Sequence, residues 1–474
     1  MSLRTAASRQ SRLLLNSASR QSNNGLLRGS LNAMRTKTTL TALSSSRSNN
    51  AITTSPASAN AIRSFSTTPR LGQALRRTPL YNLHLEKGAK MVPYAGWSMP
   101  VLYDGQSMTE AHNFVREKAG LFDVSHMRQH VFEGPGAVEF LETITPTDVT
   151  SIPAHESKLS AFLLPMTGGI VDDCIITRLT PDLFYIVTNA GRDAEDTAYL
   201  AEQLKTLNIP QCRHHIYPNR GLLALQGPHA AAILAEAMTK LDTLQHHTSQ
   251  ETSESALKNL KFGQSLFLQK DRSIWGFESS IIISRGGYTG EDGFEISLPG
   301  ELTEQYANTI LETGTPDRVR LIGLGPRDSL RLEAGMCLYG EDLDDTKTPV
   351  DASLNFIIPK NRRQSTGYHG HQVINAQLAK SAPFKKRVGI VVEGPAPARK
   401  GTQILGPGDD VIGVVTSGIP SPTLGKNIAM GYLDSEFVDL GKNGTDVGLS
   451  VRGKRREGKI VKMPFVPHKY YKGE

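Results

Sequence analysis

Several absences narrow the possibilities for this 474-residue chain. It contains no run of about eighteen consecutive apolar residues, so the sequence offers no membrane-spanning helix and we expect no membrane partner. Its three cysteines are isolated from one another and form no C-x-x-C spacing. Neither a disulfide framework nor a zinc site is therefore indicated. The histidine pairs also lack cysteine or carboxylate neighbours, so we expect no bound metal.

Acidic residues are absent from the start of the chain as far as Glu86. Residues 1–70 contain nine Arg and one Lys, and without them the formal charge falls from +7 to −3. The basic character is therefore confined to a leader rich in Ser, Thr and Ala. This composition is typical of a mitochondrial transit peptide, which predicts a disordered segment over 1–70 and a location in the matrix. The alternative, a disordered nucleic-acid-binding arm, is disfavoured because the arginines are spaced and aromatic residues are nearly absent.

The remaining length exceeds the size at which a single hydrophobic core normally stops growing, which predicts at least two domains. Segments of helical and strand periodicity alternate irregularly after residue 108. A Pro/Gly-rich tract at 393–408 then introduces short strands of the kind found in a small barrel or sandwich. We place the first region at 77–381 and a second domain of short strands, with its tail, at 382–474. The polar segment 246–258 is expected to be a surface loop insertion.

The most informative segment is the glycine-rich sequence 285–298, RGGYTGEDGFEISL. Asp292-Gly293 favours a tight hairpin turn, and strand alternation after it places Phe294 on one face and Glu295 on the other. A carboxylate opposite an apolar stripe commonly points into water. It can also accept the paired N–H donors of a guanidine-like edge, such as that of a pterin. The segment by itself leaves both interpretations open.

Two further segments carry candidate chemistry. In the segment 165–176 a glycine turn leads into a strand that begins with Asp172 and Asp173, and only one of the two can face a given pocket. Spacing does not choose between them, and solvated turn residues are an alternative for both. In the segment 323–335 a short helix starts near a proline, with Arg327 in its first turn. The helix dipole disfavours a cation there, so Arg327 requires an anionic or polar partner, with a salt bridge to Glu333 as the structural alternative.

These three segments, together with the ending KMPFVP at 462–467, resemble the glycine cleavage system T-protein family, the mitochondrial aminomethyltransferases. The resemblance covers about residues 77–471 and rests on several motifs in the same order. It implies a three-lobed α+β aminomethyltransferase fold in which a C-terminal β-barrel closes over a tetrahydrofolate site. It also implies that the chain is an enzyme of one-carbon transfer to tetrahydrofolate.

The resemblance implies roles for individual residues. Asp173, the second of the pair, is the expected catalytic aspartate, and Glu295 and Arg327 are expected to contact the pterin. Tyr470 is the expected contact from the C-terminal tail. Tyr288 and Phe356 are weaker candidates for the pocket lining.

The resemblance further implies a lipoyl group supplied by H-protein, with the P- and L-proteins of the same system as indirect partners. The basic residues Lys360, Arg362 and Arg363 are candidates for meeting an acidic partner. The alternative functions are a folate-dependent demethylase and a folate-binding iron–sulfur assembly factor of the same fold. The Lys-Gly-Cys-Tyr type motif of the assembly factors is replaced here by Arg285-Gly286-Gly287-Tyr288, which contains no cysteine.

Overall fold

The computed structural model describes residues 74–241, 253–268 and 277–473, so the predicted transit peptide at 1–70 lies outside the described residues. The described residues all belong to one compact unit. Within the described ranges no helix is both long and apolar enough to cross a membrane.

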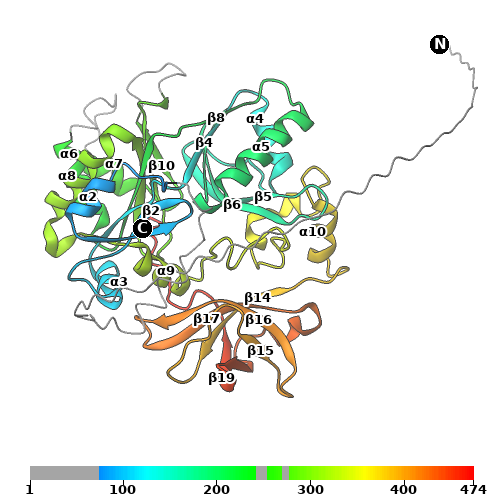
Figure 1. Ribbon diagram of the computed structural model, residues 1–474. Helices are drawn as coiled ribbons and strands as arrows, with labels where there is room; N and C mark the ends of the chain where they lie inside the picture. The colour runs from blue at the N-terminus through cyan, green and yellow to red at the C-terminus, as the bar shows by residue number, and fades with distance from the viewer. Residues whose placement is uncertain (1–73, 242–252, 269–276, 474) are drawn as a thin grey trace, which may run out of the picture. The chain divides into compact units, whose positions relative to one another are not determined.

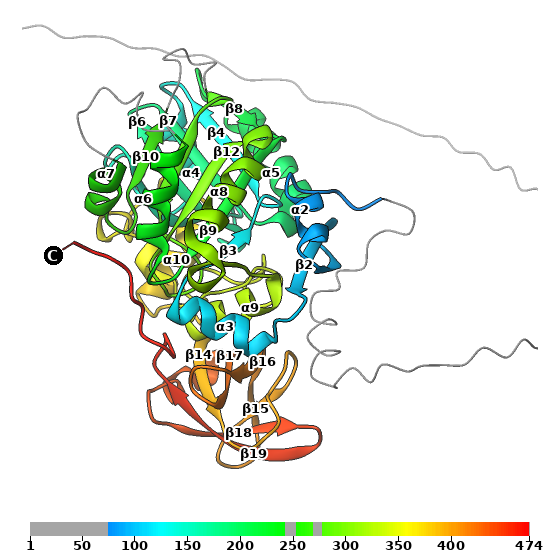
Figure 2. The same cartoon turned by 90° about the vertical axis from the view of Figure 1, so that its left-hand side faces the viewer.

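A six-stranded sheet forms the first layer, in the order β10-β11-β12-β9-β3-β13 (Figure 1). All its neighbours run antiparallel except the edge pair β13 and β3. The strands are β3 (Gly120–Asp123), β9 (Arg220–Gln226), β10 (Ser265–Leu268), β11 (Ile281–Arg285), β12 (Gly293–Pro299) and β13 (Arg320–Leu321). The helices α6 (Ala230–Lys240), α7 (Ser253–Asn259) and α8 (Gly300–Arg318) pack on it, and Figure 2 shows α6 and α8 lying across its strands.

A five-stranded antiparallel sheet forms the second layer, in the order β5-β6-β7-β4-β8. Its strands are β4 (Arg128–Glu133), β5 (Glu156–Leu163), β6 (Ile170–Thr180), β7 (Leu183–Thr188) and β8 (Arg213–Ile216). Helices α4 (Ala137–Ile144) and α5 (Asp193–Leu207) cover one face through a core that includes Phe140 and Leu200. The two sheets pack against each other through a second core, in which Tyr185 and Val187 meet Phe122 and Ala224. The order of layers is therefore helices, sheet, sheet, helices.

The C-terminal region closes into a six-stranded barrel, in the order β14-β17-β16-β15-β18-β19. This confirms the predicted fold class. The strands are β14 (Lys386–Val392), β15 (Gln403–Leu405), β16 (Val411–Ser421), β17 (Lys426–Leu433), β18 (Asp446–Val451) and β19 (Lys454–Val461). The remaining elements are α2 (Tyr81–Glu86), β1 (Ala89–Tyr94), β2 (Trp97–Tyr103), α3 (Met108–Glu117), α9 (Leu324–Glu333), α10 (His371–Leu378) and the 3-10 turns η1 (Ala190–Arg192), η3 (Asn355–Ile357), η4 (Lys360–Arg362) and η5 (Ser435–Leu440).

Helix α9 joins the barrel to the two sheets through buried ionic contacts. The carboxylate of Glu333 accepts hydrogen bonds from the Ser421 hydroxyl at 2.5 Å and from Arg116 Nη2 of α3 at 2.7 Å. Arg331 donates to Asp342 at 2.5 Å and to Ser417 of β16 at 2.9 Å. These buried ionic contacts connect α9 to both α3 and the barrel, and loss of one partner would leave an uncompensated buried charge.

Two local predictions are corrected. The polar segment 246–258 is not wholly a loop, because α7 begins at Ser253 and buries Leu257 in the core beneath α6. The hairpin between β11 and β12 does not turn on Asp292-Gly293 alone. Arg285 pairs with Phe294 and Gly286 N–H donates to the Gly293 carbonyl, so residues 286–292 form a longer loop.

Candidate functional site

Strand β6 presents its two aspartates to opposite faces of the five-stranded sheet. Asp172 lies on the face of Cys174 and Ile176, which belong to the core beneath α4 and α5, and it is fully buried. Asp173 is only partly buried and lies on the opposite face, toward the six-stranded sheet. Of the two aspartates, Asp173 alone is therefore on the face toward the six-stranded sheet, where the predicted site lies.

The Asp173 carboxylate is held by one side chain. Asn189, which follows the end of β7, donates from Nδ2 to Asp173 Oδ1 at 2.8 Å. Burial raises the pKa of Asp173 to about 6, and the hydrogen bond from Asn189 partly opposes that rise. Asp173 is therefore ionised at neutral pH while remaining within reach of protonation, which suits a group that stabilises a developing cation or handles protons.

Arg327 lies in the first turn of α9, as predicted, but Glu333 is not its partner. Glu333 is occupied by Arg116, His112 and the barrel. The guanidinium of Arg327 lies 5.0 Å from the ring centre of Tyr288, and its Nη1 is buried without a hydrogen-bond partner among the described residues. Burial lowers the pKa of Arg327, and the nearby Glu295 charge opposes that effect. A buried, unused guanidinium donor indicates a ligand acceptor at this position.

Glu295 does not point into water. It shares the face of β12 with Ser297, which is buried and donates to Gln129 of β4 at 2.6 Å, so this face looks toward the second sheet. Burial raises the pKa of Glu295 and the charge of Arg327 lowers it. No hydrogen bond from another described residue ends on the Glu295 carboxylate. The Glu295 carboxylate is therefore a free acceptor for a guanidine-like edge, and the free guanidinium donor of Arg327 lies near it.

Tyr288 connects the arginine to the aspartate. Its ring lies beside Arg327, its hydroxyl donates to the Cys337 carbonyl, and the charges of Arg331 and Asp173 both act on that hydroxyl. Burial raises the pKa of Tyr288 well above its ordinary value, so it stays neutral. Tyr288 thus lies beside Arg327 and within the field of the Asp173 charge, and its role as pocket lining stays a prediction.

The C-terminal tail docks along the same loop. The amide of Lys469 donates to the Gly290 carbonyl at 2.8 Å, and Phe262 N–H donates to the Tyr471 carbonyl at 2.8 Å. The ring of Tyr470 stacks on Phe262, with ring centres 4.0 Å apart, and its buried hydroxyl has no partner among the described residues. The tail is therefore tied down rather than frayed, and it places an aromatic ring with an unused hydroxyl next to the glycine-rich loop.

Phe356 is placed differently from the other candidates. It lies in the 3-10 turn η3 with 68% of its surface exposed. The structure records no contact between Phe356 and the other site residues. The described contacts therefore give no support to its predicted role as pocket lining.

Sequence reasoning missed three residues around this site. Asn189 is the donor to Asp173, and the only signal for it was an asparagine at a strand end followed by Ala-Gly.

The rings of Tyr94 and His126 meet edge to face at 5.5 Å, and the charge of Arg327 acts on both. Burial lowers the pKa of His126 to about 4, so its imidazole is neutral. Its Nδ1 is buried without a partner within the described ranges.

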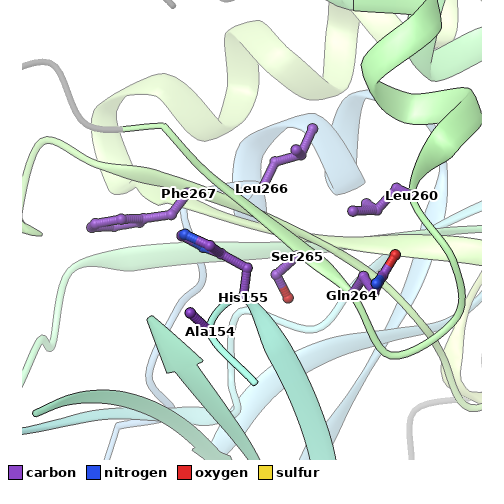
Figure 3. Close-up of a pocket in the computed structure, with 7 residues that line it drawn as sticks. All are labelled: Ala154, His155, Leu260, Gln264, Ser265, Leu266 and Phe267. Atoms are coloured by element: carbon purple, nitrogen blue, oxygen red, sulfur yellow. The ribbon is translucent and has the colours of Figure 1, made fainter. Parts of the chain in front are cut away.

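A separate hollow of about 320 Å³ lies elsewhere and contains none of the predicted site residues. Figure 3 shows its lining, which comes from β10, from the residues just before it and from the loop before β5: Ala154, His155, Leu260, Gln264, Ser265, Leu266 and Phe267. It has no carboxylate or guanidinium in its lining, so it does not offer the chemistry found around Asp173 and Arg327.

The fold defines a class of protein: two stacked sheets and a closed barrel joined at α9, with the predicted aspartate, glutamate and arginine on elements that face one another. Family models described as "GCVT N-terminal domain" and "Glycine cleavage T-protein C-terminal barrel domain" match residues 80–362 and 385–467.

Relatives support the same class. The mitochondrial aminomethyltransferase of Saccharomyces cerevisiae is 44% identical over 85% of this chain and 97% of its own length. That of Pisum sativum is 43% identical over 84% of this chain and 91% of its own. The crystal structure of glycine cleavage system aminomethyltransferase T from Bartonella henselae superimposes with a TM-score of 0.73 at 37% identity, over 84% of this chain and all of that one. The chain belongs to the glycine cleavage T-protein family, and it is an enzyme of the aminomethyltransferase class.

Proposed function

We propose that this chain transfers the methylene of an aminomethyl group from the dihydrolipoyl sulfur of lipoylated H-protein to tetrahydrofolate. The carbon–sulfur and carbon–nitrogen bonds of the aminomethyl group break. The carbon becomes the bridge between N5 and N10 of the folate, the thiol returns to the lipoyl arm, and ammonia is released. No oxidant is needed, because the transferred carbon keeps its oxidation state. Tetrahydrofolate is a co-substrate in this scheme and the lipoyl group is supplied by the partner.

One observation carries this proposal: a free acceptor and a free donor lie side by side in a site that also holds an ionised aspartate. Glu295 offers two coplanar oxygens to the guanidine-like edge of the pterin, and Arg327 Nη1 donates to an acceptor on the same ring system. The neutral ring of Tyr288 and the docked Tyr470 supply apolar walls for a flat ligand. These residues fit tetrahydrofolate.

Asp173 has the chemical role in this scheme. Positive charge develops on the carbon–nitrogen unit as a bond to the transferred carbon breaks, and an ionised carboxylate beside it stabilises that charge. With a pKa of about 6, Asp173 carries this charge at neutral pH and can also pass a proton to or from an amine. Much of the remaining acceleration would come from holding two large substrates in line.

The H-protein surface is proposed near the turn that follows η3. Lys360 is exposed there and is available to an acidic partner. Arg362 is a weaker candidate than the sequence indicated, because it is buried and donates to the carbonyl of Thr145 and to the Glu142 carboxylate. Arg363 is half-buried and is bonded to local carbonyls. The P- and L-proteins would act on the same H-protein at other steps, and the names of the relatives support a mitochondrial location, which we place in the matrix.

The test is release of ammonia from aminomethylated H-protein by the purified protein. We expect release to be at least 100-fold faster with tetrahydrofolate than without it, because the folate nitrogen is the attacking group. Dimethylglycine and sarcosine serve as alternative substrates that would reveal a demethylase. Equal ammonia release with and without folate, or faster turnover of either methylated amine, would refute the proposed function.

A further inference from the structure

Behind Asp173 lies a second pair of carboxyl groups that the proposed chemistry does not use. Asp172 of β6 and Asp196 of α5 are both fully buried. Neither forms a salt bridge within the part of the chain that the structure describes. The oxygens of Asp196 receive no N–H donor from those residues, and the polar side chains beside them are Asp172 and Thr188.

Two neighbouring buried carboxylates that no salt bridge neutralises resist a second negative charge even with Arg192 nearby, because their repulsion and desolvation would cost several kcal/mol. One proton between them converts two acceptors into a donor and an acceptor. Burial and the neighbouring acid raise the pKa of Asp172 well above its ordinary value, and burial raises that of Asp196 to about 7. The pair therefore holds one proton at neutral pH.

The position of that proton follows from the hydrogen bonds of Asp172. Its Oδ2 accepts from the backbone N–H of Asn189 at 2.8 Å, and its Oδ1 accepts from Asn189 Nδ2 at 2.9 Å. The two N–H donors stabilise the charged form of Asp172, whereas the oxygens of Asp196 receive none within the described residues. The shared proton therefore belongs to Asp196 and is donated toward Asp172.

The same Asn189 amide reaches Asp173. Its Nδ2 donates to Asp172 Oδ1 and also to Asp173 Oδ1, at 2.9 and 2.8 Å. An amide turned the other way would bring its oxygen against both carboxylates, which is unfavourable. Asp172 therefore fixes the orientation in which Asn189 donates to Asp173.

We propose that Asp172 and Asp196 are a proton-sharing acid pair that positions Asn189, and through it the Asp173 carboxylate, for aminomethyl transfer. The inference rests on the proposed function of Asp173 and adds Asp172 as a positioning residue that touches neither substrate. Asp196 supplies the proton donor to Asp172, a part that an amide can also play. Several groups face the pair from the elements around it: Thr188 at the end of β7 and Asn189 after it, Asp173 and Cys174 on β6, Arg192 and Glu195 near the start of α5, and Tyr339.

The matched variants are Asp172→Asn and Asp196→Asn, which change one atom each in the same buried pair. In Asp196→Asn the new amide donates permanently to Asp172, so Asn189 stays in place and kcat should remain within about 3-fold of the wild type. In Asp172→Asn the new NH2 faces one of the two donors of Asn189, so the Asn189 amide turns away from Asp173. We expect kcat to fall roughly 10- to 100-fold, with the KM for tetrahydrofolate unchanged.

This asymmetry distinguishes positioning from a purely structural role. Equal kcat values for the two variants, or a larger loss in Asp196→Asn, would overturn the proposal. Asp173→Asn is measured alongside them. If Asp173→Asn keeps full kcat, the proposed function of Asp173 itself is wrong. If it is inactive while Asp172→Asn matches the wild type, only the positioning proposal fails.

A spectroscopic measurement covers the case in which Asp172→Asn does not fold. At pH 7, where the pair holds its proton and most of Asp173 is ionised, the infrared spectrum of the wild type should contain the C=O stretch of a protonated carboxyl group. Asp196→Asn should lack that band, because it removes the proton-carrying member of the pair. A wild-type spectrum without such a band, or one that Asp196→Asn leaves unchanged, would overturn the shared proton.

Discussion

Replacing Asp173 by asparagine should make the folded protein more stable while abolishing turnover. The carboxylate is held in a site that raises its pKa from the ordinary 3.8 to about 6, so its ionised form is less favourable in the folded than in the unfolded chain. That difference corresponds to about 3 kcal/mol at most. Because the side chain retains partial exposure, we expect about 1–2 kcal/mol of stabilisation, or a rise of roughly 1–4 °C in Tm.

The sign of this effect depends on pH. Below about pH 4 the carboxyl group is protonated in both states, so wild type and variant should have the same Tm. Between about pH 4 and pH 6 the unfolded chain ionises first, which destabilises the wild type progressively, and the gap is complete above about pH 6. A buried carboxylate that lowers the stability of the folded protein in this way is typical of a functional site.

The assay is thermal unfolding of both proteins at pH 4, 5, 6 and 8 without folate, followed by turnover at pH 8. Asp446→Asn is the control, because Asp446 lies on the barrel with 76% of its side chain exposed and should change neither quantity. A variant Tm at pH 8 equal to or below that of the wild type would refute the claim that the site destabilises the Asp173 carboxylate. Full turnover in the variant would refute its catalytic role.

Two further predictions concern the tail and the core. Tyr470→Ala removes the stacking of Tyr470 on Phe262 and His468, at 4.0 and 4.6 Å, and should raise the KM for tetrahydrofolate about 10-fold, whereas Tyr470→Phe keeps both contacts and should change KM less than 3-fold. Steady-state kinetics measures both KM values. Equal values for the two variants would contradict a role for the stacked Tyr470 ring in folate binding. Glu333→Gln should destabilise the protein at pH 7 by up to about 3 kcal/mol, because hydrogen bonds from His112, Ser421 and Thr423 hold the pKa of Glu333 at about 2 against an ordinary 4.5. This contribution is present above about pH 4.5 and is lost toward pH 2, so urea unfolding at pH 7 and at pH 3 should show a difference between variant and wild type that shrinks with acid.

The sequence by itself determined the family, the fold class and most of the candidate site. It could do so because these features depend on local motifs: a glycine-rich loop before a strand, a capped helix that carries Arg327, and an apolar tail able to dock. The alternation of side chains along β12 also followed from the sequence, since a strand has a period of two.

Only the tertiary structure decided what each face meets. Whether Glu295 points into water depends on a second sheet packed over β12, and the choice between Asp172 and Asp173 depends on which face of β6 lies under α5. Phe356 resembled a lining residue in sequence, but the turn that carries it lies at the surface. The sequence also gave no sign that Asp196, twenty-four residues after Asp172, would share its burial. Burial and pairing are properties of contacts between distant segments, and those contacts form only when the two sheets, α9 and the tail come together.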